Sequence, residues 1–252
     1  MLRYIKNLKT YLISFYKFKD LKFKVIKLNF SIDIKFKIDI IIYMKTVIFD
    51  FDGTLTQKNQ NIWKLLWESL GYKTDKTSIY SKLYVEHCIK KTITRNQWFN
   101  LTCVAFKKKG MTKQTLNDVS SKIKLIDGAD ELIKNLYNKG FSLHIVSGCL
   151  KQSIEYVLGD LKKYFTNIES NEAIFDANDK LVKLKATDFD FKGKADYINN
   201  LLKETNSKPS EFIFIGNGDN DEWVYLTGCK TICINPDKTN HTNRQIWNDS
   251  FN

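Results

Sequence analysis

The sequence predicts an α/β protein: a three-layer, Rossmann-like core with a mainly parallel sheet, and an all-helical cap inserted after the first motif. Three short apolar runs typical of buried strands, at residues 45–50, 141–146 and 211–215, each lead into a polar motif. Amphipathic stretches typical of helices lie between them. The first two motifs, at Asp50 and Ser147, are 97 positions apart. Because a strand–helix–strand unit takes about 30 residues, this spacing predicts an insertion of about 70 residues.

These lengths divide the chain into three parts. We expect residues 44–57 and 124–252 to form the core and residues 58–123 to form the helical cap. A β-hairpin is predicted over residues 172–184, where two apolar runs flank the polar sequence Asp-Ala-Asn-Asp. Residues 1–43 form a basic extension that is not required by this fold.

The basic charge of the chain is concentrated in that extension. The formal net charge is +12, and residues 1–43 carry ten of the 40 Lys and Arg residues but only three of the 28 Asp and Glu residues. The rest of the chain is nearly balanced, so nucleic acid is not an expected partner. The extension is either a segment without a role in the fold, a basic arm that binds a surface, or an additional structured element, and the sequence leaves these three open.

Neither a membrane nor an oxidising compartment is expected. The longest wholly apolar stretch of the extension, Ile40–Met44, is far shorter than the roughly 20 residues that span a bilayer. The extension also lacks the apolar block and cleavage site of a secretory signal. The five cysteines are scattered without a C-x-x-C pair: Cys88, Cys103, Cys149, Cys229 and Cys233. This pattern favours reduced thiols in a cytoplasmic protein.

The first polar motif reads Asp-Phe-Asp-Gly-Thr-Leu-Thr at residues 50–56. Because side chains alternate along a strand, Asp50 and Asp52 are expected on one side and Phe51 in the packing on the other. Ligands of parallel α/β sheets bind beyond the carboxyl ends of strands, so both aspartates are expected at a reaction site. Magnesium relieves their mutual repulsion, since it takes hard oxygen ligands. One carboxylate can then attack phosphorus while the other transfers a proton.

At this motif the sequence resembles the haloacid dehalogenase (HAD) superfamily of phosphatases. The resemblance implies that Asp50 is the nucleophile and that Asp52 is the general acid and then the general base. It also implies that Mg²⁺ is held by the Asp50 carboxylate and the Asp52 backbone carbonyl. Dehalogenases of the superfamily lack the second aspartate, so Asp52 favours phosphoryl transfer. The helical cap between the first two motifs resembles the phosphoserine-phosphatase-like branch.

The later motifs occur in the order of that superfamily. Ser147-Gly148 follows the second apolar run, where a hydroxyl and free backbone N–H groups at a helix start suit a phosphate oxygen. The resemblance implies that Ser147 binds phosphate. It further implies a lysine at the start of the helix near residue 192, for which Lys194 is the best match and Lys192 the alternative. Such a cation offsets the charge of the aspartates and the phosphoryl group.

The last motif, Gly-Asn-Gly-Asp-Asn-Asp at residues 216–221, resembles the acidic loop that completes the metal site of the superfamily. It departs from that loop because Asn217 stands where the family has an aspartate. An amide oxygen can bind Mg²⁺ but brings no charge, so a lower metal affinity is expected. The predicted metal set is Asp50, Asp52, Asn217 and Asp221, with Asp221 orienting a metal-bound water or Lys194.

The cap is expected to close over the core and to contact the leaving group. The resemblance to phosphoserine phosphatases places Asn59 where those enzymes carry a glutamate for the substrate amine, and makes Arg95 a tentative partner for the substrate carboxylate. Trp63, Trp67 and Trp98 either stack on the substrate or form the core of the cap, which is the commoner role of aromatic residues at helical spacing.

The function expected from these motifs is Mg²⁺-dependent hydrolysis of a small phosphorylated metabolite through an aspartyl phosphate. One alternative is a phosphotransferase or mutase of the same architecture, which protects the aspartyl phosphate from water. The other is a catalytically impaired binding module that acts through the basic extension. Neither the substrate nor the oligomeric state follows from the sequence.

Overall fold

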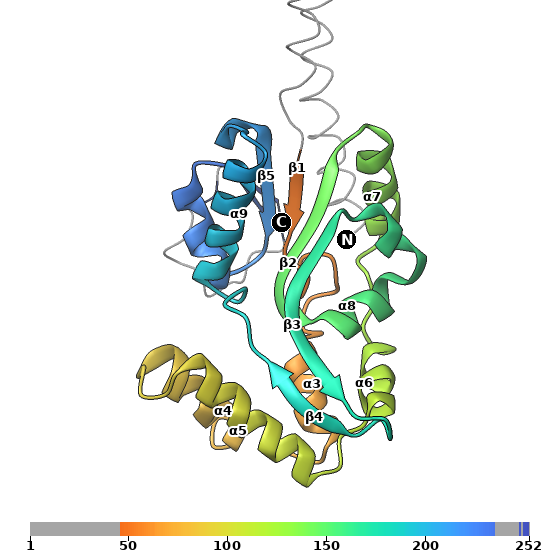
Figure 1. Ribbon diagram of the computed structural model, residues 1–252, viewed down its shortest axis with the longest axis vertical. Coiled ribbons are helices and arrows are strands. Elements are labelled where there is room, and N and C mark those ends of the chain that lie inside the picture. The colour runs from red at the N-terminus through yellow and green to blue at the C-terminus, as the bar shows by residue number, and fades with distance from the viewer. Residues whose placement is uncertain (1–45, 235–246, 248, 252) are drawn as a thin grey trace, which may run out of the picture.

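The computed structural model describes residues 46–234, 247 and 249–251 of the chain (Figure 1). The basic extension of residues 1–43 lies outside the described residues, so the expectations about it remain predictions.

The described residues contain a seven-stranded sheet with the strand order β4-β3-β2-β1-β5-β6-β7. The strands are β1 (Thr46–Phe49), β2 (Ser142–Leu150), β3 (Asn167–Phe175), β4 (Leu181–Lys185), β5 (Phe212–Gly216), β6 (Lys230–Ile234) and β7 (Asp249–Phe251). Neighbouring strands run parallel except β3 and β4, which pair antiparallel. The predicted, mainly parallel sheet is therefore confirmed, and so is the predicted hairpin.

Helices cover both faces of this sheet, as the prediction of three layers requires (Figure 1). One face is covered by α7 (Ala129–Asn138), α8 (Lys151–Leu158) and the 3-10 helix η2 (Gly159–Tyr164). The other is covered by α9 (Lys192–Glu204) and the 3-10 helix η4 (Asp219–Thr227), with the short η3 (Pro209–Glu211) leading into β5. Side-chain alternation along β1 links the layers: Val47 and Phe49 pack with α7 and α8, whereas Ile48 packs with α9.

The segment between the first two motifs is helical, as predicted. It contains α3 (Ile62–Ser69), α4 (Ile79–Tyr84), the π-helix η1 (Val85–Ile89), α5 (Arg95–Lys108) and α6 (Lys113–Ser120). The four α-helices begin at residues whose side-chain oxygen accepts a backbone N–H of the first turn, namely Asn61, Ser78, Thr94 and Thr112. No helix of the described part of the chain is long and apolar enough to cross a membrane.

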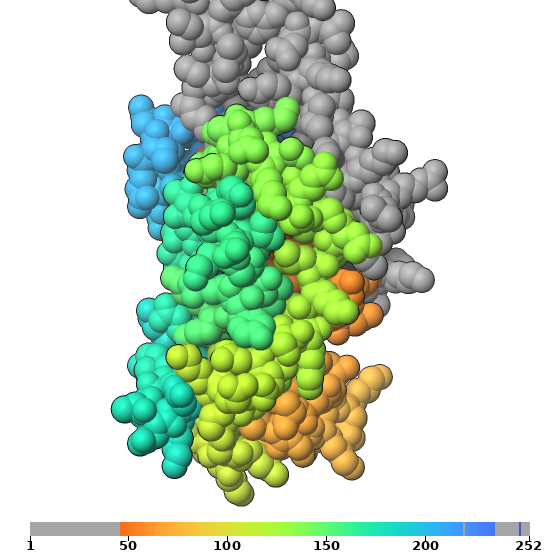
Figure 2. Space-filling view, turned by 90° about the vertical axis from the view of Figure 1, so that its right-hand side faces the viewer, coloured from red at the N-terminus to blue at the C-terminus, as the bar shows by residue number. Residues whose placement is uncertain are grey.

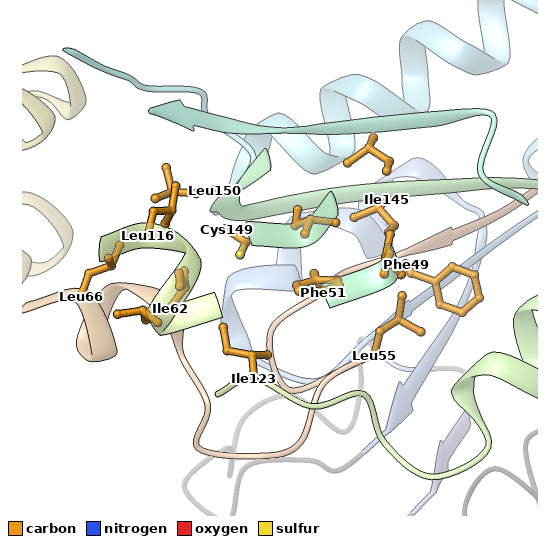
Figure 3. Packing of buried hydrophobic residues seen from close by; sticks show 14 of the residues in the cluster. Phe49, Phe51, Leu55, Ile62, Leu66, Leu116, Ile123, Ile145, Cys149 and Leu150 are labelled. Carbon is orange, nitrogen blue, oxygen red and sulfur yellow. The ribbon is translucent and has the colours of Figure 1, made fainter. Parts of the chain in front are cut away.

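The cap and the core share one hydrophobic cluster. Ile62 and Leu66 of α3 and Leu116 of α6 pack beside Cys149 and Leu150 at the end of β2 (Figure 3). The same cluster includes Val47 and Phe49 of β1 and the apolar side chains of α7 and α8, which cover one face of the sheet. The helical segment is therefore joined to the core by continuous apolar packing as well as by the chain.

The β3–β4 hairpin provides a second connection. Its turn forms a bridge between Lys180 and Thr112, and the Leu181 backbone N–H donates to the Met111 carbonyl at 3.0 Å. β4 also packs along α5, and the space-filling view shows the hairpin beside this part of the cap at one end of the molecule (Figure 2). The hairpin thus extends from the core sheet onto the cap.

Candidate active site

A cavity of about 550 Å³ lies beyond the carboxyl ends of the central strands, where the polar motifs meet. Its lining includes Asp50, Asp52, Ser147, Gly148 and Asn217. The strands that carry these residues are neighbours, because β1 pairs in parallel with both β2 and β5. Five residues that the sequence predicted for the site therefore line one cavity.

Asp50 is fixed at the end of β1. Its backbone N–H donates to the Ile215 carbonyl of β5 at 2.9 Å, and the residue is 3% exposed. Alternation places Asp50 on the same side of the strand as Ile48, which is the side that α9 covers. This explains the contact with Lys194 of α9, whose Nζ lies 3.1 Å from Asp50 Oδ2.

Lys194 is completely buried and joins two acidic groups. Its Nζ lies 2.5 Å from Asp221 Oδ1. The other oxygen of Asp221 accepts the backbone N–H groups of Asn217 at 3.1 Å and Gly218 at 3.3 Å. Both carboxylate oxygens of Asp221 are therefore engaged by protein donors. The structure shows the contact of Asp221 with Lys194. That Asp221 orients Lys194 or a metal-bound water, and that it belongs to the metal site, stay predictions.

The charges of Lys194, Asp221 and Asp50 shift the pKa values of Lys194 and Asp221. Burial by itself lowers the pKa of Lys194, but the negative charges of Asp221 and Asp50 outweigh it, so the pKa of Lys194 is raised above its usual value. Burial raises the pKa of Asp221 to about 6, against the opposing effect of Lys194 and with the added repulsion of Asp50. At pH 7 both Lys194 and Asp221 are then charged, as an ion pair requires.

The pKa of the Asp52 carboxyl group is raised well above its usual value. Burial and the nearby charge of Asp50 raise the pKa of Asp52 to about 7, although hydrogen bonds from the Cys149 thiol and the Ile62 N–H act in the opposite direction. Its Oδ1 atom is buried and has no hydrogen-bond partner in the described structure. A carboxyl group in this condition can give up or take a proton near neutral pH.

The donor chemistry of the site fits a hard cation such as Mg²⁺. The Asp50 carboxylate, the Asp52 backbone carbonyl and the Asn217 amide oxygen are all hard oxygen donors, which Mg²⁺ prefers. The Asn217 oxygen already accepts the Thr54 hydroxyl at 3.2 Å. Among the described residues, no three His, Cys, Asp or Glu side chains gather as a metal site. The set therefore depends on amide and carbonyl oxygens.

The structure corrects the expected position of Ser147 and Gly148. They were predicted at the start of a helix, but β2 continues through both residues to Leu150, and α8 begins at Lys151. The reason is that β3 stays paired with β2 over this stretch, with a shift in register between Ser147 and Leu150. Ser147 nevertheless lines the cavity, and its Oγ accepts the Cys149 backbone N–H at 3.3 Å.

The two residues predicted to bind the substrate, Asn59 and Arg95, do not line the cavity. Asn59 is exposed in a turn with φ +71°, and the residue of this loop that lines the cavity is Asn61. Arg95 forms an ion pair with Asp190, the residue that lies beside Gly148. A Cβ atom at Gly148 would lie 1.0 Å from Asp190 Oδ1, so a larger residue there would displace the Asp190 carboxylate. The substrate roles of Asn59 and Arg95 stay predictions that this geometry does not support.

Sequence reasoning did not identify Asp190 or Asn61. Asn61 carried a usable signal, since an asparagine directly before a periodic apolar segment is a helix N-cap. Asp190 carried none, because its partner Arg95 lies 95 positions earlier in the chain. The three tryptophans differ in burial: Trp67 is 2% exposed, whereas Trp63 and Trp98 are partly exposed, and all three line the cavity.

Residues 47–224, more than half of the chain, match the family described as haloacid dehalogenase-like hydrolase. No curated protein matches the sequence. Among solved structures, a substrate-bound phosphoserine phosphatase complex is similar with a TM-score of 0.64 and 17% identity, over 82% of this chain and 92% of that chain.

Two further structures show the same fold. A HAD family hydrolase from Salmonella enterica subsp. enterica serovar Typhi has a TM-score of 0.65 and 18% identity, over 83% of this chain and 68% of that chain. A phosphoserine phosphohydrolase-like protein from Francisella tularensis subsp. tularensis has a TM-score of 0.57 and 26% identity, over 82% of this chain and 95% of that chain.

Proposed function

Because the chain belongs to the haloacid dehalogenase-like hydrolase family, we propose that it is a Mg²⁺-dependent phosphatase. It hydrolyses a small phosphomonoester through an aspartyl phosphate on Asp50. The observation that carries this proposal is the convergence of Asp50, Asp52, Ser147 and Asn217 on one cavity, with Lys194 paired to Asp50 beside it.

The first half of the reaction transfers the phosphoryl group to the protein. The Asp50 carboxylate attacks phosphorus in line, an oxygen–phosphorus bond forms, and the bond between phosphorus and the leaving oxygen breaks. Asp52 donates its proton to that leaving oxygen, which departs as an alcohol. The raised pKa of Asp52, about 7, supports this role because it keeps a fraction of the carboxyl protonated near neutral pH.

The second half returns Asp50 to its starting state. Asp52, now ionised, takes a proton from a water molecule, and the resulting hydroxide attacks phosphorus. The bond between phosphorus and the Asp50 oxygen breaks, which releases inorganic phosphate and the free carboxylate.

Both steps require positive charge near the phosphoryl group, because this group is an anion. Lys194 supplies one fixed charge at 3.1 Å from Asp50, and the Ser147 hydroxyl is a further hydrogen-bonding group in the cavity. A bound Mg²⁺ held by Asp50, the Asp52 carbonyl and Asn217 would neutralise phosphoryl charge and hold the phosphate against the nucleophile.

The test is release of inorganic phosphate from a generic phosphomonoester by the purified full chain. We expect release with Mg²⁺ and no acceptor, loss of release with EDTA, and a decrease of at least about a thousandfold in Asp50→Asn. Beryllium fluoride is expected to form an adduct on Asp50 in the wild type. Asp118→Asn, a change on α6 at a residue that does not line the cavity, serves as the matched control.

The same assay separates the alternatives. Release of the substrate alcohol only when an acceptor alcohol is added, with the phosphoryl group recovered on the acceptor and not as inorganic phosphate, would establish a transferase. A wild type no more active than Asp50→Asn, with no beryllium fluoride adduct, would refute catalysis and leave a binding role.

A further inference from the structure

The cavity has a second set of lining residues that the phosphoryl chemistry does not use. Seven of its described lining residues are aromatic, and together we call them the aromatic wall: Trp63, Trp67, Tyr80, Tyr84, Trp98, Phe99 and Phe191. Six come from the cap helices α3, α4 and α5, and Phe191 directly precedes α9. The aromatic wall therefore belongs mainly to the part of the molecule that contacts the leaving group of a phosphomonoester.

The rings of the aromatic wall hold one another in place. Trp63 packs edge-on against Phe99 at 5.3 Å between ring centroids, and its Nε1 donates to the Gly148 carbonyl at 2.9 Å. Trp98 lies between Phe99 and Tyr84, at 6.1 and 6.2 Å. Such mutual edge-to-face packing gives a preformed apolar surface that loses little freedom when a ligand binds.

The described lining of the cavity offers no positive charge to an anionic leaving group. No described lining residue is Lys or Arg. Arg95 does not line the cavity; its guanidinium carbon lies 4.8 Å from the Phe99 ring centre and 5.4 Å from that of Trp98. Its Nη2 pairs with Asp190, and its Nε and Nη1 are buried without a hydrogen-bond partner in the part of the chain that the structure describes. An amino-acid carboxylate in the cavity would therefore meet no cation among the described lining residues. The guanidinium also already engages the rings of Trp98, Phe99 and Phe191.

We propose that the leaving group is an alcohol bearing a neutral aromatic ring, which packs against the aromatic wall while its phosphate lies at Asp50. This inference rests on the proposed phosphatase activity and specifies its substrate class. Offset or edge contacts with two or three rings give an aromatic ligand an advantage over an aliphatic ligand of the same size. An amino-acid phosphate gains no such contact, and its carboxylate meets no cation among the described lining residues.

The test compares four substrates whose leaving alcohols are all alkyl alcohols, so that leaving-group chemistry does not decide the result. They are benzyl phosphate, cyclohexylmethyl phosphate, phosphoserine and phosphocholine. We expect kcat/KM for benzyl phosphate to exceed each of the others by about tenfold or more. An equal or higher value for cyclohexylmethyl phosphate, phosphoserine or phosphocholine overturns the proposal, and the last two outcomes identify an amino-acid or a quaternary ammonium substrate.

Substitutions in the aromatic wall test whether its rings cause the preference for benzyl phosphate. Tyr84→Ala and Trp98→Leu are expected to lower kcat/KM for benzyl phosphate by about threefold to tenfold each, and to change that for cyclohexylmethyl phosphate by less than twofold. Tyr84 is 47% exposed, so this variant is expected to fold. The control is Tyr156→Ala, because Tyr156 is similarly exposed, at 49%, and does not line the cavity. Equal losses on both substrates would overturn the proposal.

Failure of the proposed activity can be told apart from failure of this inference. If no substrate releases phosphate, calorimetric binding of benzylphosphonate and cyclohexylmethylphosphonate to the wild type still measures the preference for a ring. Tighter binding of benzylphosphonate, by about tenfold, supports the aromatic site without catalysis. Equal affinity overturns it.

Discussion

Lys194 is the residue at which charge and stability are most closely coupled. It is completely buried, and it touches Asp50 and Asp221, which are both buried as well. Removing its charge leaves two carboxylates without a cation in a medium that solvates them poorly. The same residue therefore stabilises the fold and prepares the nucleophile.

We predict that Lys194→Met lowers the free energy of unfolding by roughly 3–5 kcal/mol in the presence of EDTA. Urea denaturation followed by circular dichroism gives this value. Lys192→Met is the matched control, since Lys192 is exposed two residues earlier on the same helix and its change is expected to stay within about 0.5 kcal/mol. Equal losses in the two variants would contradict the role of Lys194.

His144 gives the fold a pH dependence that is separate from the site. It lies inside β2, 3% exposed, with Nε2 2.8 Å from the Ser142 hydroxyl and Nδ1 2.7 Å from the Tyr197 hydroxyl. Burial lowers the pKa of His144 to about 4 from its usual 6.5. Between these two values the unfolded chain binds a proton that the folded protein excludes, so stability falls as the pH decreases through this window.

We expect the free energy of unfolding to fall by roughly 3 kcal/mol as the pH decreases from about 7 to about 4. Above about pH 7 there is no loss, and by about pH 4 the loss is complete. We predict that His144→Asn lowers stability at pH 7 and flattens the decline between pH 6.5 and 4.5. The measurement is the free energy of unfolding from urea titrations at several pH values, as the difference between wild type and variant. Parallel curves for the two proteins would show that His144 does not titrate in this way.

At the scale of elements, the start of α9 fixes the position of Lys194. Gly193 lies against the preceding loop, where its N–H donates to the Asp188 carbonyl at 3.1 Å. A Cβ atom at this position would lie 2.5 Å from the Asp188 carbonyl carbon, which is backbone and cannot rotate away. The first turn of α9 can therefore approach the loop only with glycine at this position.

We predict that Gly193→Ala displaces the start of α9 and costs about 1–3 kcal/mol of stability. Because Lys194 follows directly, phosphate release is expected to fall by more than the loss of folded protein explains. Thermal unfolding and kcat/KM measured on the same preparation test this. Lys192→Ala is the control, and an alanine variant at 193 with unchanged kcat/KM would refute the close packing.

The elements also show where sequence reasoning succeeded and where it stopped. Apolar runs predicted β1, β2 and β5, because a buried parallel strand requires continuous apolar residues whatever it packs against. The same reasoning ended β2 too early, at Val146, since Ser147 and Gly148 carry a helix-cap signal that pairing with β3 overrides. Local preference is outweighed there by hydrogen bonds to a strand that the local sequence does not reveal.

The site was predictable to the extent that its residues follow strand ends. Asp50, Asp52, Ser147 and Asn217 were found in this way, and they line one cavity. The pairing of Arg95 with Asp190 was not predictable, because it joins a cap helix to a core loop and leaves no periodic pattern in either segment. The prediction for Asn59 missed Asn61 because loop residues can be aligned by counting only when the loop conformation is known.

For the molecule as a whole, the shared hydrophobic cluster predicts that cap and core unfold together. Leu66 of α3 is fully buried in the cluster that also contains Phe49 of β1 (Figure 3). We predict that Leu66→Ala costs about 2–5 kcal/mol and shifts a single unfolding transition without splitting it.

Tryptophan fluorescence and far-ultraviolet circular dichroism, recorded along one urea titration, test this. Three of the five tryptophans, Trp63, Trp67 and Trp98, lie in the cap. Fluorescence therefore weights the cap more strongly than circular dichroism, which reports on the whole molecule. The two midpoints are expected to coincide in wild type and variant, and separated midpoints would show that the cap unfolds independently.

The central position of β1 has a consequence for biosynthesis. β1 lies between β2 and β5, and the loop that follows it reaches Asn217, which is 163 positions beyond Thr54 in the chain. At a translation rate of about 5–20 residues per second, roughly 10–30 s separate the emergence of the two contact partners from the ribosome. During that interval the nascent strand is apolar and unpaired on the edge that β5 will cover, so the segment that ends at the future nucleophile is exposed to aggregation while the rest of the chain is synthesised.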